Sequence, residues 1–198
     1  MIAPVTLKNE HVYLEPLERL HIKELETVIE NSGLNDLWYT TVPSIEQVKP
    51  YVEQALQMRA DQSGFPFIVR RINNGTVGEI VGSTRFCNIE LANKRLEIGY
   101  TWYVKESQRT SINTGCKYLL LKHAFEQYKC IAVEFRTHWI NHKSRAAIER
   151  LGAKLDGVLR NHRISPNGTY RDTVVYSIIE SEWPMVKSHL EYKLKSYN

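Results

Sequence analysis

Residues 95–114 read RLEIGYTWYVKESQRTSINT, and this stretch decides the fold. Apolar and polar side chains alternate through its first half, which predicts a strand from Arg95 to Val104. One face of that strand would carry Leu96, Ile98, Tyr100, Trp102 and Val104, and the other Glu97, Gly99, Thr101 and Tyr103. A polar, basic stretch from Lys105 to Ser111 comes next, and helical spacing of apolar residues follows it.

A strand, a tight loop and a helix in this order place free backbone N–H groups where the helix begins. The first turn of a helix has N–H groups without intrahelical partners and carries the positive end of the helix dipole, so it suits a phosphate or pyrophosphate. Nearby basic side chains agree with an anionic ligand: Lys105, Arg109, Lys117 and Lys122. A solvated basic loop with an ordinary N-cap explains the same composition equally well.

The rest of the chain mixes strand and helix periodicities. After a short strand at 12–17 come two helices, of which the second has a capping box at Ser44 and Gln47 and runs to about residue 62. A hairpin turn is predicted at Asn74-Gly75. The later elements are a strand at 130–137, a short helix at 141–151, strands at 154–164 and 170–179, and a last helix at 182–194. This order predicts one α/β (or α+β) domain over residues 1–198, with helices on a mostly antiparallel sheet.

Composition narrows the function classes. The 198 residues carry a net charge of +4, which permits an anionic ligand but falls short of the dense basic face of a nucleic-acid binder. Three cysteines without a CxxC pair indicate a reducing compartment. No secretory signal or long apolar run is present, so we expect a cytoplasmic protein without a membrane partner.

Three further motifs make a family resemblance specific. They are Asn141–Ile148, Leu151–Ala153 and Arg171–Tyr176, and together with the loop at 108–114 they resemble the GNAT superfamily of N-acetyltransferases. Within it, the three motifs resemble the subgroup that includes the ribosomal-protein N-terminal acetyltransferases. The resemblance covers about residues 8–185. It implies a twisted sheet of about seven strands with a splayed central pair. In one respect the chain departs from the family, because Ser111 and Asn113 stand where the family usually has glycine.

The resemblance also implies a binding site for acetyl-CoA. Backbone groups of Trp102, Tyr103 and Val104 would pair with the pantetheine arm in the manner of a missing strand. The pyrophosphate would lie on the amides of the loop and helix start: Arg109, Thr110, Ser111, Ile112, Asn113 and Thr114. Asn141 would bond the cofactor arm, and Ser144 would be the general acid near its sulfur. Asn141 also fits a simple N-cap.

The attacking amine must be neutral, which calls for a base. An α-amino group of pKa about 7.7–8.0 needs less help than a lysine amine of pKa about 10.4. Glu97 is the leading candidate, Glu134 the second and His138 the third; each fits a surface or paired polar residue as well. His138 and His142 have the spacing of a metal-binding pair, but they straddle a strand–helix junction without an obvious third ligand. We therefore reject a metal.

The acceptor pocket is expected at one end of the sheet. Trp38 and Tyr39, in the loop between the first two helices, are candidates to line it. A cluster at the last hairpin is the other part of the expected pocket: Arg160, His162, Arg163, Tyr170 and Arg171. Exposed charges on a hairpin are an equally good interpretation of this cluster.

The leading hypothesis is an N-acetyltransferase that moves the acetyl group of acetyl-CoA directly to a primary amine. No cysteine stands where a covalent acyl-enzyme would form, and Cys116 is interpreted as packing. The acceptor is a protein N-terminus, ribosomal or not, or a small amine, and the protein is a monomer or homodimer. One alternative is a non-catalytic acyl-CoA-binding or sensing module. Another is nucleic-acid or ribosome binding, for which no RNA-binding signature appears.

Overall fold

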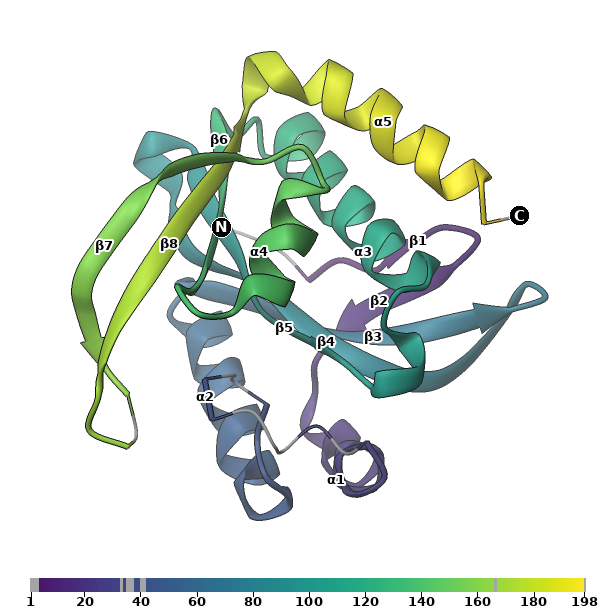
Figure 1. The fold of residues 1–198 in the computed structure, drawn as a ribbon. Coiled ribbons are helices and arrows are strands. Elements are labelled where there is room, and N and C mark those ends of the chain that lie inside the picture. Colours follow the sequence, from purple (N-terminus) through teal and green to yellow (C-terminus); the bar gives the residue numbers. More distant parts are fainter. Residues whose placement is uncertain (1–3, 33, 35–37, 40–41, 166, 198) are drawn as a thin grey trace.

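A single mixed sheet organises the chain (Figure 1). The computed structural model describes residues 4–32, 34, 38–39, 42–165 and 167–197. The strand order is β1-β2-β3-β4-β5-β6-β8-β7. The strands are β1 Leu7–Lys8, β2 Val12–Pro16, β3 Gly64–Asn73, β4 Thr76–Glu90, β5 Arg95–Tyr103, β6 Ala132–His138, β7 Lys154–Ile164 and β8 Tyr170–Ile179. All neighbours are antiparallel except β5 and β6, so the predicted fold class is confirmed, with the two-residue β1 as an eighth strand.

Helices cover both faces of the sheet (Figure 1). We call one side the α1–α2 face, because α1 (Ile22–Glu30) and α2 (Val48–Ala60) lie on it. The other side is the α3 face, covered by α3 (Ser111–Lys122), α4 (His142–Glu149) and α5 (Trp183–Lys195). Each face has its own apolar core cluster, and the larger one lies under α3 and α5. Burying both faces is what allows one sheet to hold the chain together.

Local signals in the sequence appear where they were predicted. The β3–β4 hairpin turns at Asn74 and Gly75, which have φ of 49° and 80°. Two positive φ values at these positions are what a type I′ turn requires. The Ser44–Gln47 capping box is also present: the Gln47 side chain accepts a hydrogen bond from the Ser44 N–H at 3.2 Å. The box opens a 3₁₀ turn that leads into α2.

A β-bulge in β5 overturns the predicted alternation of that strand. Tyr100 has φ of 50°, and Tyr100 and Thr101 together lie opposite the single residue Thr84 of β4. A bulge inserts one extra residue and so exchanges the faces of all residues beyond it. Trp102 therefore joins the core on the α1–α2 face, not the face of Leu96 and Ile98.

The central strands β5 and β6 are splayed, as the resemblance implied. They pair in parallel at only three positions, from Arg95 with Ala132 to Glu97 with Glu134. Beyond that point β5 continues to Tyr103 and β6 continues to His138, but the two strands no longer pair with each other. The facing edges of the two strands therefore leave backbone groups without a strand partner.

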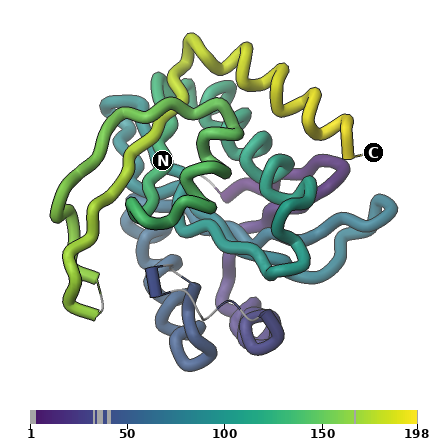
Figure 2. Tube along the Cα trace, in the orientation of Figure 1, coloured from purple at the N-terminus to yellow at the C-terminus, as the bar shows by residue number. Residues whose placement is uncertain are grey.

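The hairpin β7–β8 forms a long arm at the edge of the sheet. Only β8 pairs with β6, and β7 lies outside it. In the trace of Figure 2 this arm curves away from the body of the molecule and reaches toward the level of α2. Its concave side thus continues the α1–α2 face of β5 and β6.

Candidate active site

The start of α3 lies beside the end of β5. Thr110 is its N-cap, with φ of −111°, and its hydroxyl accepts the Ile112 N–H at 3.3 Å. The positive φ of this loop falls on Arg109, at 63°, whereas Ser111 and Asn113 lie in the first turn of the helix. Neither has a positive φ, so neither needs to be glycine for its backbone conformation. The other amides of the first turn have no intrahelical acceptor.

The basic residues predicted around this loop separate into two groups. Lys105 and Arg109 are exposed on the loop. Lys117 instead lies inside the core, where its Nζ donates to Thr101 Oγ1 at 2.6 Å and to Thr84 Oγ1 at 3.3 Å. Burial lowers the pKa of Lys117 to about 8. Lys117 therefore supports the bulged part of β5 and does not belong to the surface of the loop.

Asn141 is the N-cap of α4. Its side-chain oxygen accepts the backbone N–H of Ser144 at 3.1 Å, so the capping interpretation is confirmed. The helix lies on the α3 face, where Ile148 enters the core. The Ser144 hydroxyl has no hydrogen-bond partner in the part of the chain that the structure describes. It is half-buried and remains free to donate.

Glu97 lies at the point where β5 and β6 part, on the α1–α2 face. It is 8% exposed, and one carboxylate oxygen accepts a hydrogen bond from Asn88 Nδ2 at 2.7 Å. Burial raises the pKa of Glu97, while Asn88 and Arg136 oppose that effect. Gly99 leaves room for the carboxylate, because a Cβ at that position would come within 2.8 Å of Glu97 Oε1.

The other two base candidates differ from Glu97. Burial acts to raise the pKa of Glu134, but hydrogen bonds from Arg95 and Arg136 lower it overall. Burial and the charge of Arg171 lower the pKa of His138. The His138 ring is buried, and its Nε2 has no partner among the described residues. Of the two carboxylates, Glu97 therefore has the raised pKa and Glu134 the lowered one, while the His138 ring keeps one nitrogen without a partner among the described residues.

Trp38 and Tyr39 do reach the α1–α2 face. Their rings lie edge-on to the His138 ring, with centroid distances of 5.5 and 6.1 Å. Tyr170 lies apart from them, 70% exposed at the start of β8, and its register position is on the side opposite Arg171. Its predicted acceptor role stays a prediction.

The side chains of Trp102 and Tyr103 are buried on opposite faces of β5. Trp102 Nε1 donates to the Tyr51 hydroxyl at 3.4 Å. A ligand between β5 and β6 would therefore meet the backbone of this segment. All three cysteines are buried, and Cys116 is part of the core under α3, as its interpretation as packing required.

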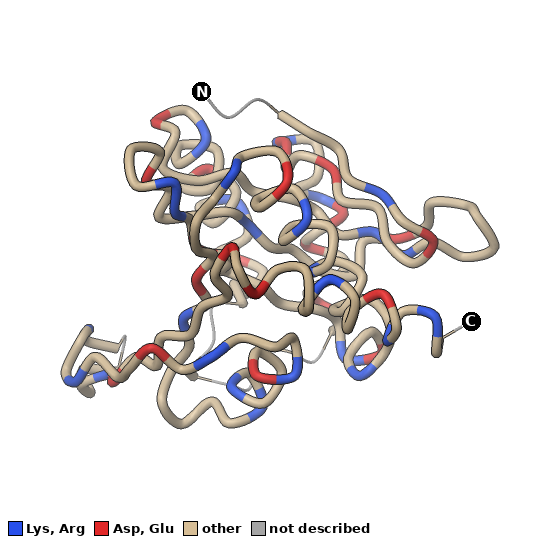
Figure 3. Tube along the Cα trace, turned by 90° about the horizontal axis from the view of Figure 1, so that it is seen from above, with Lys and Arg blue, Asp and Glu red and all other residues tan. Residues whose placement is uncertain are grey.

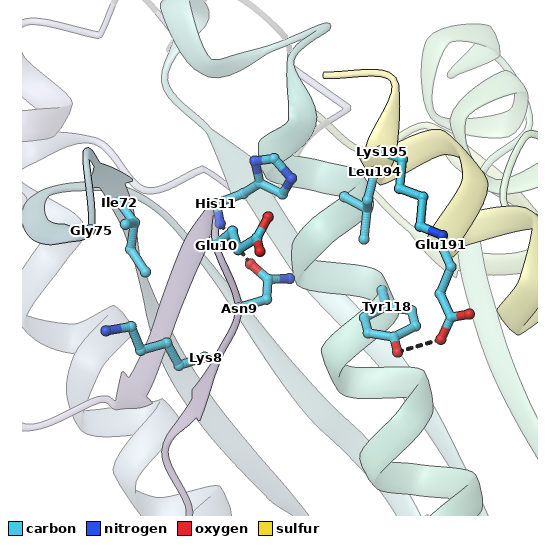
Figure 4. Close-up of a pocket in the computed structure, with 10 residues that line it drawn as sticks. All are labelled: Lys8, Asn9, Glu10, His11, Ile72, Gly75, Tyr118, Glu191, Leu194 and Lys195. Carbon is cyan, nitrogen blue, oxygen red and sulfur yellow. Dashed lines mark hydrogen bonds between the residues drawn. The ribbon is translucent and has the colours of Figure 1, made fainter. Parts of the chain in front are cut away.

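A separate groove of about 700 Å³ opens away from these residues (Figure 4). It lies between the β1–β2 turn and the end of α5, where the Tyr118 hydroxyl donates to Glu191 at 2.8 Å. Its side chains carry mixed charges, and its lining includes none of the predicted base and acid candidates Glu97, Glu134, His138 and Ser144. Within the described ranges, no three His, Cys, Asp or Glu residues come together as a metal site, and no helix has the length and apolarity to span a bilayer.

Comparison with known proteins agrees with this geometry. A family model described as "Acetyltransferase (GNAT) domain" matches residues 11–154. The chain belongs to the GNAT acetyltransferase family. The Bacillus subtilis protein named "Putative ribosomal N-acetyltransferase YdaF" is 29% identical over 182 residues, which are 88% of this chain and 94% of that protein. The predicted resemblance is therefore confirmed, and the protein is an acetyltransferase.

Solved structures of GNAT proteins share the whole architecture. A GCN5-related N-acetyltransferase from Brucella melitensis has a TM-score of 0.84 and 26% identity, covering 98% of this chain and 86% of that one. Mycobacterium smegmatis RimJ in complex with CoA-disulfide has a TM-score of 0.79 over 96% and 95% of the two chains. At 17% identity, the likeness to RimJ concerns the fold alone.

Two buried cations escaped the sequence-based interpretation. The sequence analysis groups Lys117 with the basic side chains near the anion-binding loop, and it does not single out Arg85. Arg85 is fully buried, and its guanidinium lies over the Tyr100 ring at 4.0 Å. For Lys117 the sequence held a signal, because Lys117 is the only charged residue in the segment 115–121. A nearly all-apolar helix segment predicts burial on every side, and all of these residues except Tyr118 are buried. For Arg85 no local signal existed.

Proposed function

We propose that this GNAT enzyme transfers the acetyl group of acetyl-CoA directly to a primary amine. The observation that carries the proposal is the opening between β5 and β6. Pairing stops at Glu97 and Glu134, with the α3 helix start on one face and the Glu97 carboxylate on the other. If acetyl-CoA binds on the α3 face, with its thioester in this opening, an amine can reach the thioester from the α1–α2 face.

The residues at the opening fit the parts of acetyl-CoA. Free amides of the first turn of α3, with the exposed Lys105 and Arg109, suit its pyrophosphate. The unpaired backbone of Trp102–Val104 suits the amide groups of its pantetheine arm. Asn141 already caps α4 through one oxygen lone pair, and its amide nitrogen is left for the cofactor.

Proton transfer accompanies the acyl transfer. The amine nitrogen forms a bond to the acetyl carbon, the carbon–sulfur bond breaks, and one proton leaves the nitrogen. We assign that proton to Glu97, directly or through a water, because its raised pKa makes it a better base near neutral pH. Ser144 donates a proton to the departing sulfur, and solvent returns a proton to Ser144 and takes the one held by Glu97, so the enzyme is restored. A thiol of pKa about 8.5 needs only a weak donor.

The acceptor is a protein N-terminus in this proposal. The Bacillus subtilis relative is named a ribosomal N-acetyltransferase, which supports this acceptor, and with such an acceptor we infer a cytoplasmic enzyme. An α-amine also asks less of the base than a lysine amine. A purely acyl-CoA-binding role is less well supported, because binding alone gives no reason to bury a carboxylate at the opening.

A turnover screen tests the proposal. Purified protein is given acetyl-CoA with a panel of N-terminal peptides and small amines, and CoA thiol release is measured alongside acetylated product by mass spectrometry. We expect product with at least one N-terminal peptide, matched in amount to thiol release. Acetyl-CoA binding without product on the whole panel would support the binding module instead.

A further inference from the structure

Two arginines face each other on the β7–β8 arm. Arg163 of β7 and Arg171 of β8 are register partners, so both side chains leave the same side of the hairpin. Like charges placed directly opposite each other are destabilising in a sheet. Burial lowers the pKa of Arg171 and the charge of Arg163 lowers it further, in agreement with their placement on one side of the hairpin.

This pair shares the α1–α2 face with the candidate base. Alternation along β8 places Arg171 on the side of Thr173, which is paired with His138 of β6. His138 in turn shares its side of β6 with Glu134, the register partner of Glu97. Electrostatics agree, because Arg163 opposes the raised pKa of Glu97 and Glu97 opposes the lowered pKa of Arg171.

Neither Arg163 nor Arg171 has a carboxylate partner in the described part of the chain. Other arginines of this region are paired: Arg95 and Arg136 with Glu134, and Arg160 with Asp172. The Nε of Arg171 is also buried without a hydrogen-bond partner among the described residues. An unneutralised charge pair and an unsatisfied buried donor both cost stability, and one bound anion would remove both costs.

We propose that Arg163 and Arg171 bind a carboxylate of the acceptor. The enzyme would then select a primary amine that has a carboxylate close by, as in a peptide with Asp or Glu at its second or third position. An extended peptide advances about 3.3–3.6 Å per residue, so such a carboxylate stays within a few residues' reach of the amine. This inference rests on the proposed function, because it specifies the acceptor of the same reaction.

Paired peptides test the selection. Acetylation of Ala-Glu-Ala-Ala and Ala-Ala-Glu-Ala is compared with that of their Gln isosteres, and free glutamate is compared with glutamine amide to distinguish an amino acid from a peptide. We expect the carboxylate to raise kcat/KM by about 10- to 100-fold, mainly through KM. Arg163→Gln and Arg171→Gln should lose that preference, so that each variant acetylates the Glu peptide and its Gln isostere with similar kcat/KM.

Arg160→Gln is the matched control. Arg160 is on the same strand and is exposed, as Arg163 is, but it is paired with Asp172, so Arg160→Gln should keep the preference for the acidic peptides. The inference is overturned if wild-type enzyme treats Glu and Gln peptides alike. It is also overturned if the Arg163 and Arg171 variants lose kcat/KM equally on the Glu and the Gln peptides, because an equal loss indicates a structural effect.

Equilibrium binding separates this inference from the proposed function. If no amine is acetylated, the proposed function fails, and binding of the same peptides is measured by calorimetry in the presence of acetyl-CoA. Saturable binding of the Glu peptide that the Arg163 and Arg171 variants weaken by about tenfold or more would still support the carboxylate site. Equal binding of Glu and Gln peptides would overturn it.

Discussion

The two sides of the β5–β6 opening are built by different means. On the α3 face, the candidate cofactor groups are backbone amides and carbonyls from one continuous stretch, residues 102–114, together with the start of α4. On the α1–α2 face, the candidate acceptor groups are side chains from separate strands: Glu97, His138, Arg163 and Arg171. Basic and acidic positions are interspersed over the rest of the trace (Figure 3).

This difference has a physical consequence. Almost any substitution keeps the backbone N–H donors, so the α3 face tolerates residues that differ from the usual family glycines, such as Ser111 and Asn113. The α1–α2 side depends on charge and burial, and a single atom change there alters a pKa or leaves a charge unpaired. Substitutions that alter charge should therefore have larger effects on the α1–α2 face than substitutions of loop side chains have on the α3 face.

The largest effect is expected at Glu97. Glu97→Gln removes the base but keeps the size of the side chain and its Asn88 contact, and we expect kcat to fall by about 10²- to 10³-fold. Wild-type kcat should also fall as pH drops through the raised pKa of Glu97, because only the carboxylate accepts a proton. That acidic limb should be absent in the variant, as measured by a pH–rate profile.

Glu134→Gln is the comparison variant. Glu134 is the register partner of Glu97 but is held ionised by Arg95 and Arg136. We expect Glu134→Gln to keep the acidic limb but to have a lower melting temperature, because Arg95 loses its ion-pair partner and Arg136 keeps only Glu97. An equal loss of kcat in both variants would argue against Glu97 as the base.

The next effect is on stability and concerns Lys117, which ties α3 to the bulge of β5. Its folded pKa of about 8 lies below the ordinary 10.5, so the unfolded chain holds the proton more tightly. The cost of burying the charge is therefore complete below about pH 8 and is relieved as pH rises toward 10.5. Lys117→Met should raise the free energy of unfolding at pH 7 by about 2 kcal/mol.

Urea unfolding at about pH 7 and pH 10 measures this difference. The hydroxyls of Thr84 and Thr101 lie 2.8 Å apart and still bond each other without the lysine, so the variant should fold. The difference in unfolding free energy between Lys117→Met and wild type should be smaller at the higher pH. A variant less stable than wild type at both values would mean that the ammonium hydrogen bonds outweigh the burial cost.

A smaller effect is expected at Ser144, on the α3 face. Ser144→Ala removes the hydroxyl but keeps the backbone N–H that Asn141 caps, so α4 should begin as before. We expect kcat to fall about tenfold, since a thiolate leaving group needs little acid help, with unchanged acetyl-CoA affinity. Ser188→Ala on α5 is a control for loss of a helix hydroxyl. Unchanged kcat in Ser144→Ala would reject its role as the acid.

Much of the fold was predictable because its signals are local. The Asn74-Gly75 turn and the Ser44–Gln47 box are encoded within four residues, and both appear in the structure. The splayed strands followed from the family resemblance. The alternation of β5 failed at Tyr100, because a bulge depends on pairing with Thr84 of another strand and leaves no periodic trace in β5 itself.

The candidate site likewise contains residues that local motifs predict and residues whose positions depend on strand pairing. The loop at 108–114 and the Asn141 cap are contiguous motifs, and both were located from the sequence. Register, in contrast, decides that Arg163 faces Arg171 while Arg160 pairs with Asp172. The local sequence does not distinguish Arg160, Arg163 and Arg171. The irregular strand pairing between Leu159 and Arg163 is what places Arg163, and not Arg160, opposite Arg171.

The smallest effect is expected where the chain departs from its family. Ser111→Gly and Asn113→Gly restore the usual residues at helical positions that need no positive φ. Helix propensity then disfavours each glycine by roughly 0.5–1 kcal/mol, while removal of a Cβ gives the pyrophosphate closer access to the amides. These effects oppose each other, so acetyl-CoA affinity by calorimetry should change by no more than about threefold. A tenfold gain would show that the side chains of Ser111 and Asn113, and not only the backbone, set affinity on the α3 face.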